Sequence, residues 1–290
     1  MSGEQRILEA QALSKRYGRR TWALQGIDLA IPRGGITALV GPNAAGKSTL
    51  IKTWVGFERP TRGAVRVSGI DPWKDRSRAL THVGYIPQSP SLYDTLSVDD
   101  HLDLAVQLRP AFDRAYARDR LDELGIPGDQ QGRSLSGGQQ AQVALALALG
   151  TRAEILLLDE PLASLDPLAR REFLHLLTDA VRADGATALL SSHIVTDVEQ
   201  ACDRLIVLGV GRVLLHDTVA GALAGHRLAI DGNGPVGDAI GSFAGPAGDR
   251  LTLVHQPRSA EVGGLRPATL EEIVLGYLAS GRVAPREAVA

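Results

Sequence analysis

The stretch GITALVGPNAAGKST, residues 35–49, joins an apolar run to a glycine-rich loop and then to the start of a helical pattern. Its second part, 41–49, matches G-x-x-x-x-G-K-[ST], a loop that binds phosphate when a strand precedes it and a helix follows it. Glycines permit the tight turn and let backbone N–H groups approach phosphate oxygens, and the helix start adds its positive dipole end. A chance glycine turn is the alternative, but the motif, the strand and the helix all agree.

We therefore predict that this phosphate loop holds the phosphates of a nucleotide. Lys47 would place its charge against the terminal phosphates, and the hydroxyl of Ser48 would offer an oxygen to Mg²⁺. The predicted nucleotide-binding residues of the loop are Gly41, Pro42, Asn43, Ala44, Ala45, Gly46, Lys47, Ser48 and Thr49.

A second chemical signal is ILLLDEP, residues 155–161, in which an apolar run ends on two acids. Ligands of open α/β sheets bind at the carboxyl ends of strands. We predict that Asp159 holds Mg²⁺, directly or through water, and that Glu160 orients and deprotonates an attacking water. The alternative is an acidic turn before a helix that starts at Pro167. The phosphate loop argues against it, because phosphoryl transfer needs a metal holder and a water-orienting group.

Apolar runs of strand length alternate with helical patterns along much of the chain. This alternation predicts an α/β domain with a mostly parallel sheet. The predicted strands cover 35–40, 64–69, 82–87, 153–160, 186–192 and 203–209, with a helix over 47–56.

Two regions break the alternation. Residues about 89–134 carry helical patterns without a strand, including a helix over 97–109 that Ser97 caps with Asp100. After about residue 220 the chain is rich in Gly and Pro, and it then ends in an amphipathic helix. For that helix Thr269 and Glu272 form the predicted capping box, and Gly281 is the predicted end.

Composition excludes or disfavours several classes of protein. The chain has 290 residues, a net charge of −2 and one cysteine, Cys202, so an internal disulfide and a cysteine-built metal site are excluded. The charge balance gives no reason to expect nucleic-acid affinity. The apolar runs are shorter than the ~20 residues of a transmembrane helix, and the N-terminus has no signal-peptide pattern. We expect any membrane association to depend on a partner.

The stretch LSGGQ, residues 135–139, precedes a long apolar run and is called here the Ser136 loop. Ser136 and the two glycines would expose N–H groups at a helix start and so form an anion site, although a Ser-Gly-Gly helix cap is an ordinary alternative. The predicted nucleotide-binding residues of this loop are Ser136, Gly137, Gly138 and Gln139. Together with GPNAAGKST and LLLDEP, in this order, LSGGQ resembles the nucleotide-binding subunit of an ATP-binding cassette (ABC) transporter. The resemblance covers roughly residues 7–217.

The resemblance implies a P-loop NTPase fold with an antiparallel β region near the N-terminus, a helical insertion and a small C-terminal extension. It also implies ATP and Mg²⁺ as ligands, and a second copy of the chain or a paralogous cassette as partner. In the family each ATP lies between two chains. We therefore expect Lys47 of one chain to face Ser136, Gly137 and Gly138 of the other.

Four further positions match the family. By resemblance, Tyr17 stacks on the adenine, Gln88 contacts Mg²⁺ and the attacking water, Asp166 meets the opposite subunit, and His193 touches the terminal phosphate. Each has an ordinary alternative, which is respectively a surface aromatic, a loop residue, a helix cap and a histidine at a strand end. The predicted catalytic residues are Glu160, His193 and Gln88, and the predicted metal ligands are Ser48, Gln88 and Asp159.

The sequence departs from the family pattern at two positions. Ala44 stands where glycine is frequent, and we expect little effect unless its φ is positive. Gln142 stands where the family often has arginine, which raises the question of how its helix is held in place.

The function that the resemblance implies is an ATP-hydrolysing subunit that powers transport through a separate membrane permease, at the cytoplasmic face of the cell membrane. The expected division is a cassette over 1–220, with a helical subdomain over about 89–134, and an accessory region over 221–290. The last helix resembles that of cassettes that serve exporters, although packing on the core explains it equally. Leu92, Tyr93 and Leu96 are candidate permease contacts.

Two other functions stay open. One is a soluble cassette ATPase that acts on the ribosome or on DNA, although such proteins usually carry two cassettes, a long coiled coil or a zinc module. The other is a nucleotide-responsive regulator without a transport role. No nucleic-acid partner is expected, and no residue identifies the cargo.

Overall fold

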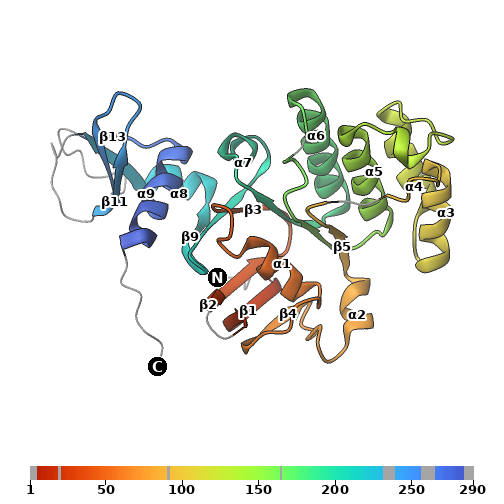
Figure 1. Cartoon of the computed structure of the whole chain (residues 1–290), viewed down its shortest axis with the longest axis horizontal. Helices are drawn as coiled ribbons and strands as arrows, with labels where there is room; N and C mark the ends of the chain where they lie inside the picture. Colours follow the sequence, from red (N-terminus) through yellow and green to blue (C-terminus); the bar gives the residue numbers. More distant parts are fainter. Residues whose placement is uncertain are drawn as a thin grey trace.

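The computed structural model describes residues 5–18, 21–89, 92–163, 165–230, 239–255 and 265–283. A central sheet occupies the middle of the elongated molecule, a helical region lies at one end, and a small sheet with two helices lies at the other (Figure 1). An antiparallel sheet near the N-terminus packs below the central sheet in the same view.

The central sheet has six strands in the order β5-β6-β7-β3-β8-β9. Its first five strands are parallel and β9 is antiparallel to β8, which confirms the predicted α/β class. The strands are β3 (Gly35–Val40), β5 (Val83–Ile86), β6 (Ile155–Leu158), β7 (Thr187–Ser192), β8 (Arg204–Gly209) and β9 (Arg212–Thr218).

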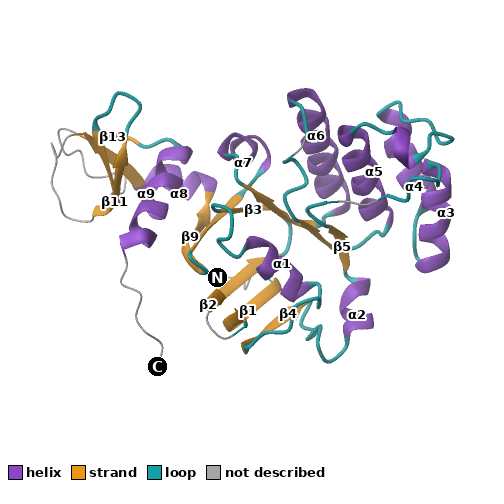
Figure 2. Ribbon diagram, in the orientation of Figure 1, coloured by secondary structure: helices purple, strands orange, loops and turns teal. Residues whose placement is uncertain are grey.

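Both faces of this sheet are covered (Figure 2). Along β6, Leu157 joins the core against α1 and the antiparallel sheet, whereas Leu156 and Leu158 join the core against α5 and α6. Successive residues of a strand point to opposite faces, so a strand covered twice must be apolar throughout. The covering helices are α1 (Lys47–Trp54), α5 (Gly137–Gly150), α6 (Pro167–Asp184) and α7 (Val195–Ala201).

The antiparallel sheet consists of β1 (Arg6–Tyr17), β2 (Thr21–Pro32) and β4 (Arg62–Val67), in the order β2-β1-β4. It confirms the antiparallel region expected near the N-terminus. Strand β4 belongs to this sheet, beside β1, although the alternation of strands and helices suggested a place among the parallel strands. Partner choice depends on contacts with β1 that are distant in sequence, so the local pattern could not give it.

The region between β5 and β6 is helical. It contains α3 (Val98–Leu108), α4 (Arg114–Glu123), the short 3₁₀ helix η1 (Gly132–Ser134) and α5, and α2 (Arg76–Thr81) precedes β5. Ser97 caps α3 and forms the predicted capping box with Asp100. Helices α3, α4 and α5 share one apolar cluster that includes Leu102, Leu121 and Val143.

A four-stranded antiparallel sheet follows the central sheet, and the sequence did not predict it. Its order is β11-β12-β10-β13. The strands are β10 (His226–Ile230), β11 (Ala239–Ala244), β12 (Arg250–His255) and β13 (Leu265–Pro267), with helices α8 (Val219–Gly225) and α9 (Leu270–Val283) beside them. Gly and Pro obscure the alternation here, and residues 231–238 of the Gly-rich stretch lie outside the described chain.

Helix α9 starts at the predicted capping box, where the Glu272 N–H donates to Thr269 Oγ1 and the Thr269 N–H donates to Glu272 Oε2. The prediction that Gly281 ends it is wrong, since the helix continues to Val283. Gly281 instead allows close packing, because a Cβ there would stand 3.0 Å from Leu214 Cδ1. Among the helices that the structure describes, none has the length and apolar character needed to cross a membrane.

Glu154 links the ends of β2 and β4 to the central sheet, at the edge of that sheet opposite the phosphate loop. Its carboxylate accepts hydrogen bonds from Arg33 and Ser68 and lies 2.8 Å from His82 Nδ1. Partial burial raises the pKa of Glu154, but the bonds from Ser68 and Arg33 hold it below its ordinary value. The charged form is therefore the one that the fold stabilises.

We predict that Glu154→Gln lowers the free energy of unfolding by about 1–2 kcal/mol at pH 7. A carboxylate with a lowered folded pKa stabilises the fold above its unfolded pKa, and that contribution is lost as the pH falls through the folded pKa. Urea unfolding at pH 7 and at pH 3 should therefore show a difference from wild type that shrinks in acid. Glu123→Gln, which breaks the exposed pair with Arg120, is the control and should cost about 0–0.5 kcal/mol.

Candidate functional site

The phosphate loop leaves β3 at its carboxyl end and enters α1 at Lys47. Gly46 is the N-cap of α1 with φ 108°, a conformation that favours glycine. A Cβ at Gly41 would stand 2.2 Å from the Leu208 carbonyl, and one at Gly46 would stand 2.5 Å from the Ala23 carbonyl. Both glycines are therefore required by close backbone approach from β8 and β2, which fixes the loop on two sides.

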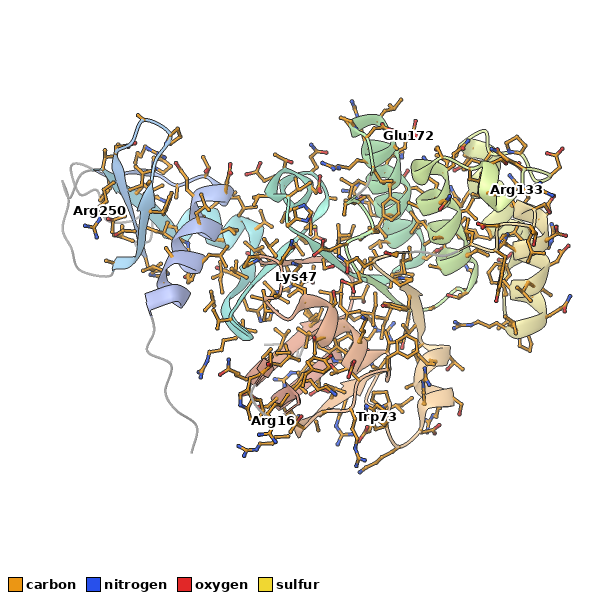
Figure 3. The ribbon with its side chains drawn as sticks, viewed as in Figure 1. Arg16, Lys47, Trp73, Arg133, Glu172 and Arg250 are labelled. Atoms are coloured by element: carbon orange, nitrogen blue, oxygen red, sulfur yellow. The ribbon has the colours of Figure 1, made fainter. Side chains whose placement is uncertain are left out.

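Lys47 lies in the interior of this loop, and its side chain is only 4% exposed. Figure 3 shows it near the middle of the molecule, where α1 begins beneath the central sheet. Its Nζ donates to the carbonyls of Gly41 at 2.7 Å and Pro42 at 3.2 Å, and it lies 2.9 Å from Glu160 Oε1. The ammonium is thus held where the loop turns.

Asp159 follows β6 and meets the phosphate loop directly. Its Oδ1 accepts hydrogen bonds from the hydroxyls of Ser48 at 2.9 Å and Ser191 at 3.2 Å. Its Oδ2 is buried and has no partner among the described residues. Burial raises the pKa of Asp159, and the two serine hydroxyls offset this only in part.

This donor set fits Mg²⁺. A buried carboxylate oxygen without a partner is costly, and a hard cation satisfies it when neutral oxygens lie beside it. Ser48 supplies such an oxygen at the same carboxylate. We therefore regard Asp159 and Ser48 as the residues suited to hold the metal.

Glu160 lies between two nitrogen-bearing side chains. Its Oε1 is the partner of Lys47, and its Oε2 lies 3.4 Å from His193 Nδ1. The Glu160 side chain is 8% exposed and that of His193 is 46% exposed. Glu160 is therefore buried, whereas His193 lies partly in solvent. The backbone at Glu160 has φ 49°, which strains a non-glycine residue and is typical of functional positions.

Ser191 was missed in the sequence, although it links both acids. Its Oγ accepts from the Glu160 N–H at 2.7 Å and donates to Asp159 Oδ1. It follows Leu190, which pairs with Leu158 in the neighbouring parallel strand. A hydroxyl at the end of an apolar strand beside the acidic one is the signal that could have identified it.

Gln88 and Tyr17 lie at the rim of the site. Gln88 is exposed and lies two residues beyond β5, whose Ile86 carbonyl accepts from the Asp159 N–H at 2.9 Å. Tyr17 ends β1 with Lys15 Nζ 5.1 Å from its ring centre. Burial raises the pKa of Tyr17 and a hydrogen bond with Thr49 lowers it, so its hydroxyl reaches the last residue of the phosphate loop. Their ligand contacts remain predictions.

The Ser136 loop starts α5 and forms a complete capping box. Ser136 Oγ accepts from the Gln139 N–H at 3.2 Å, and Gln139 Oε1 accepts from the Ser136 N–H at 2.9 Å. Among the described residues the N–H groups of Gly137 and Gly138 have no hydrogen-bond partner at this exposed helix start, as an anion site requires. Within the described chain no hydrogen bond or ion pair joins this loop to the phosphate loop, so the two candidate anion sites are separate in one chain.

Asp166 is the N-cap of α6, with Oδ1 accepting from the N–H groups of Leu168 at 2.9 Å and Ala169 at 3.0 Å. The alternative interpretation of Asp166 as a helix cap therefore describes its role within one chain. Its expected contact with an opposite subunit remains a prediction.

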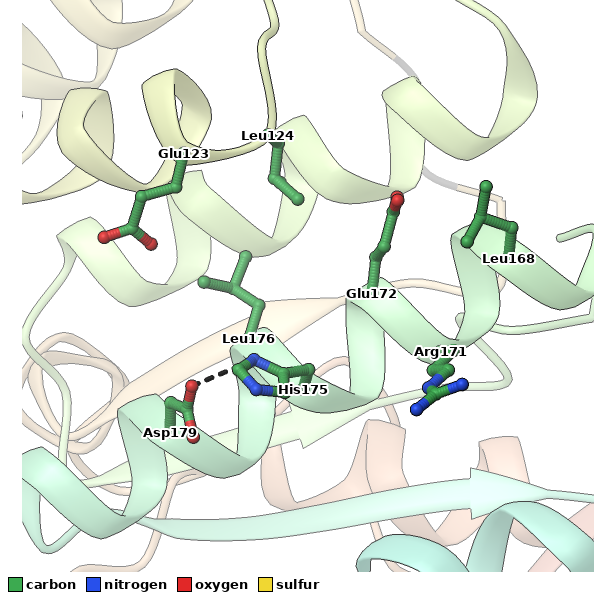
Figure 4. A pocket seen from close by; sticks show the side chains of 8 residues that line it. All are labelled: Glu123, Leu124, Leu168, Arg171, Glu172, His175, Leu176 and Asp179. Atoms are coloured by element: carbon green, nitrogen blue, oxygen red, sulfur yellow. Dashed lines mark ion pairs between the residues drawn. The ribbon is translucent and has the colours of Figure 1, made fainter.

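Gln142 answers the question of how α5 is held. Its side chain is buried, and its Nε2 donates to Glu172 Oε2 on α6 at 2.8 Å. Figure 4 shows Glu172 projecting from α6 in a groove that also exposes His175 and its ion-pair partner Asp179. A neutral amide thus ties α5 to α6 without the positive charge that the resemblance led us to expect.

Ala44 has a positive φ of 63°, so the condition under which its identity matters is met. An L-residue with a side chain is strained in this region, whereas glycine is not. The alanine therefore strains the phosphate loop.

Comparison with known proteins is consistent with this site. The family model described as ABC transporter matches residues 24–163. The chain is 34% identical to the phosphonates import ATP-binding protein PhnC of Thiobacillus denitrificans, over 73% of this chain and 88% of that protein. It is 34% identical to the lipopolysaccharide export system ATP-binding protein LptB of Acidithiobacillus ferridurans, over 72% and 88%. It is 32% identical to the methionine import ATP-binding protein MetN of Streptomyces avermitilis, over 81% and 74%.

Solved structures agree. An ATP-binding subunit of an ABC transporter superposes with a TM-score of 0.66 at 31% identity, over 74% of this chain and 91% of that one. A dimeric ATP-binding cassette in a post-hydrolysis state, bound to ADP and Pi, superposes with a TM-score of 0.66 at 25% identity, over 73% and 98%.

We predict that Ala44→Gly raises the free energy of unfolding by about 0.5–1 kcal/mol, because relief of the positive φ outweighs the added freedom of the unfolded chain. Ala45→Gly is the matched control, since Ala45 is buried and is not among the residues with positive φ. This variant should lower the free energy of unfolding by about 1 kcal/mol. Urea unfolding of both variants measures the difference. Equal loss of stability in both would contradict the strain at Ala44.

Proposed function

The chain belongs to the ABC transporter family as an ATP-binding subunit with ATPase activity, and from this premise we propose that two copies close around ATP and Mg²⁺ to drive export through a separate permease. The observation that carries the proposal is the separation of two anion sites in one chain. Lys47 and the acids Asp159 and Glu160 form one candidate site, and the Ser136 loop at the start of α5 forms another. A second copy would bring the two together.

In the proposed reaction, the γ-phosphate of ATP enters the phosphate loop and replaces Glu160 as the partner of Lys47. The ion pair between Lys47 and Glu160 then opens, which leaves Glu160 free to accept a proton from the attacking water. His193, which already lies beside Glu160 Oε2, contacts the same terminal phosphate. The Ser136 loop of the partner copy offers its N–H groups to the phosphate from the other side.

Asp159, Ser48 and Gln88 are the proposed ligands of Mg²⁺, which would neutralise phosphate charge as ATP is cleaved. Ser191 fixes Asp159 and the Glu160 backbone, so it positions both acids for this task. Tyr17 stacks on the adenine, and Asp166 meets the opposite copy near the closed interface.

We also propose that the cassette covers residues 1–220, with a helical subdomain over about 89–134 and an accessory region over 221–290. The helical subdomain would meet the permease at the membrane's cytoplasmic face. Of the three candidate contacts, Tyr93 is 63% exposed, whereas Leu92 packs on the helical apolar cluster and Leu96 is only partly exposed. Tyr93 is therefore the strongest candidate.

Export is the direction we propose on the basis of the C-terminal helix α9. The names of similar proteins include import and export systems, so they do not favour either direction. Helix α9 also buries Leu270, Ile273 and Val274 against the end of the central sheet. This packing is the competing explanation for the helix.

We predict that Glu160→Gln lowers the rate of ATP hydrolysis about 10²–10⁴-fold, because it removes the general base. ATP should still bind, and the variant should accumulate as a nucleotide-bound pair in size-exclusion chromatography. Normal turnover would exclude Glu160 as the base, and a purely monomeric ATP complex would argue against the two-chain site. Lys47→Ala is the control, and it should weaken ATP binding itself in an isothermal titration.

Affinity purification of the tagged chain from its native membranes tests the permease and the direction. We expect a stoichiometric polytopic membrane protein to co-purify, and we expect vesicles containing both proteins to move cargo away from the cassette side when ATP is added. Association with ribosomes or DNA instead would support a soluble cassette. Movement toward the cassette side would show import.

A further inference from the structure

His101 is a buried histidine on α3. Among the contacts of the described residues, none joins it to the phosphate loop or to Asp159 and Glu160 of the nucleotide site. It is 6% exposed, and both of its ring nitrogens bond to the loop that precedes α3. Nδ1 lies 2.7 Å from the Ser97 carbonyl, and Nε2 accepts from the Tyr93 N–H at 2.8 Å. Because the Tyr93 N–H is the donor, Nε2 accepts and Nδ1 donates to the Ser97 carbonyl.

The same loop, residues 92–97, is also bonded to the chain that leads into the Ser136 loop. The Gly132 N–H donates to the Leu96 carbonyl at 2.9 Å, and the Arg133 N–H donates to the Asp94 carbonyl at 3.2 Å. A Cβ at Gly132 would stand 2.5 Å from the Tyr93 carbonyl, so this close approach requires glycine. Segment 130–134 is thus hydrogen-bonded to the loop 92–97. It also leads directly into the Ser136 loop, because Ser136 follows it by two residues in the sequence.

Tyr93 connects this arrangement to the surface. Its ring stacks on His101 with centroids 6.0 Å apart, and most of the ring remains exposed. The loop begins four residues after Gln88, at the rim of the nucleotide site. A force on Tyr93 would therefore reach the Ser136 loop through backbone hydrogen bonds.

We propose that His101 is a positioning residue that holds the loop 92–97 on segment 130–134 and so fixes the Ser136 loop for closure over the partner's ATP. This inference rests on the proposed two-chain function. It assigns His101 no contact with nucleotide. Loss of His101 should impair pairing and turnover and leave binding at the phosphate loop intact.

The test compares His101→Leu with His101→Gln in the full chain. Leu removes the acceptor for Tyr93, whereas Gln can place its Oε1 near the former Nε2. We expect Leu to speed hydrogen exchange at the Tyr93 amide about 5–10-fold, as the loss of one hydrogen bond implies. The turnover number should fall at least 5-fold, with the ATP dissociation constant within 2-fold of wild type, and Gln should restore both values to within about 2-fold.

Two further variants separate positioning from general damage. His175→Leu removes an exposed histidine on α6 and should match wild type. Gly132→Ala pushes the loop away without changing His101, and it should reproduce the loss of turnover at unchanged ATP affinity. It also keeps the proposal testable if His101→Leu fails to fold.

Wild-type turnover in both His101→Leu and Gly132→Ala, or equal losses of ATP affinity and turnover, would overturn the role of His101. Failure of the proposed function is a different result. In that case the wild-type chain would not hydrolyse ATP, and two copies of it would not associate when ATP is bound.

Discussion

The buried ion pair between Lys47 and Glu160 is the constraint around which the site is arranged. Two charges that are almost excluded from water are stable only when they face each other and their remaining hydrogen-bonding groups are satisfied. Lys47 meets this condition through hydrogen bonds to two loop carbonyls, and the second carboxylate oxygen of Glu160 lies 3.4 Å from His193 Nδ1. Lys47 and Glu160 therefore neutralise each other within one chain.

The parallel sheet makes this pairing possible. Strands β3, β7 and β6 are neighbours, so Lys47, Ser191 and the two acids leave the sheet at the same carboxyl edge. Strand β2 of the antiparallel sheet packs closely on the phosphate loop at Gly46, and β8 packs closely on it at Gly41. Phosphate binding thus depends on backbone contacts between elements far apart in the sequence.

The Ser136 loop is built differently, since its geometry is local. A capping box satisfies two of its N–H groups and leaves those of the glycines free. Its orientation comes from its neighbours, namely the bond between Gln142 and Glu172 behind it and the bonded segment 130–134 before it. The first joins it to the helix after the acids, and the second joins it to the loop that carries Tyr93.

The linear pattern was enough to predict the features that short-range chemistry controls. The phosphate loop, the acidic strand and the capping boxes at Ser97 and Thr269 depend on residues within a few positions of one another, so their patterns survive in the linear chain. Three features could be read only from the folded chain, namely the pairing of β4 with β1, the sheet formed by the Gly-rich C-terminal region, and the link that Ser191 makes between both acids. Each of these features depends on atoms brought together from distant parts of the chain, and hydrophobic periodicity carries no information about which distant partner is chosen.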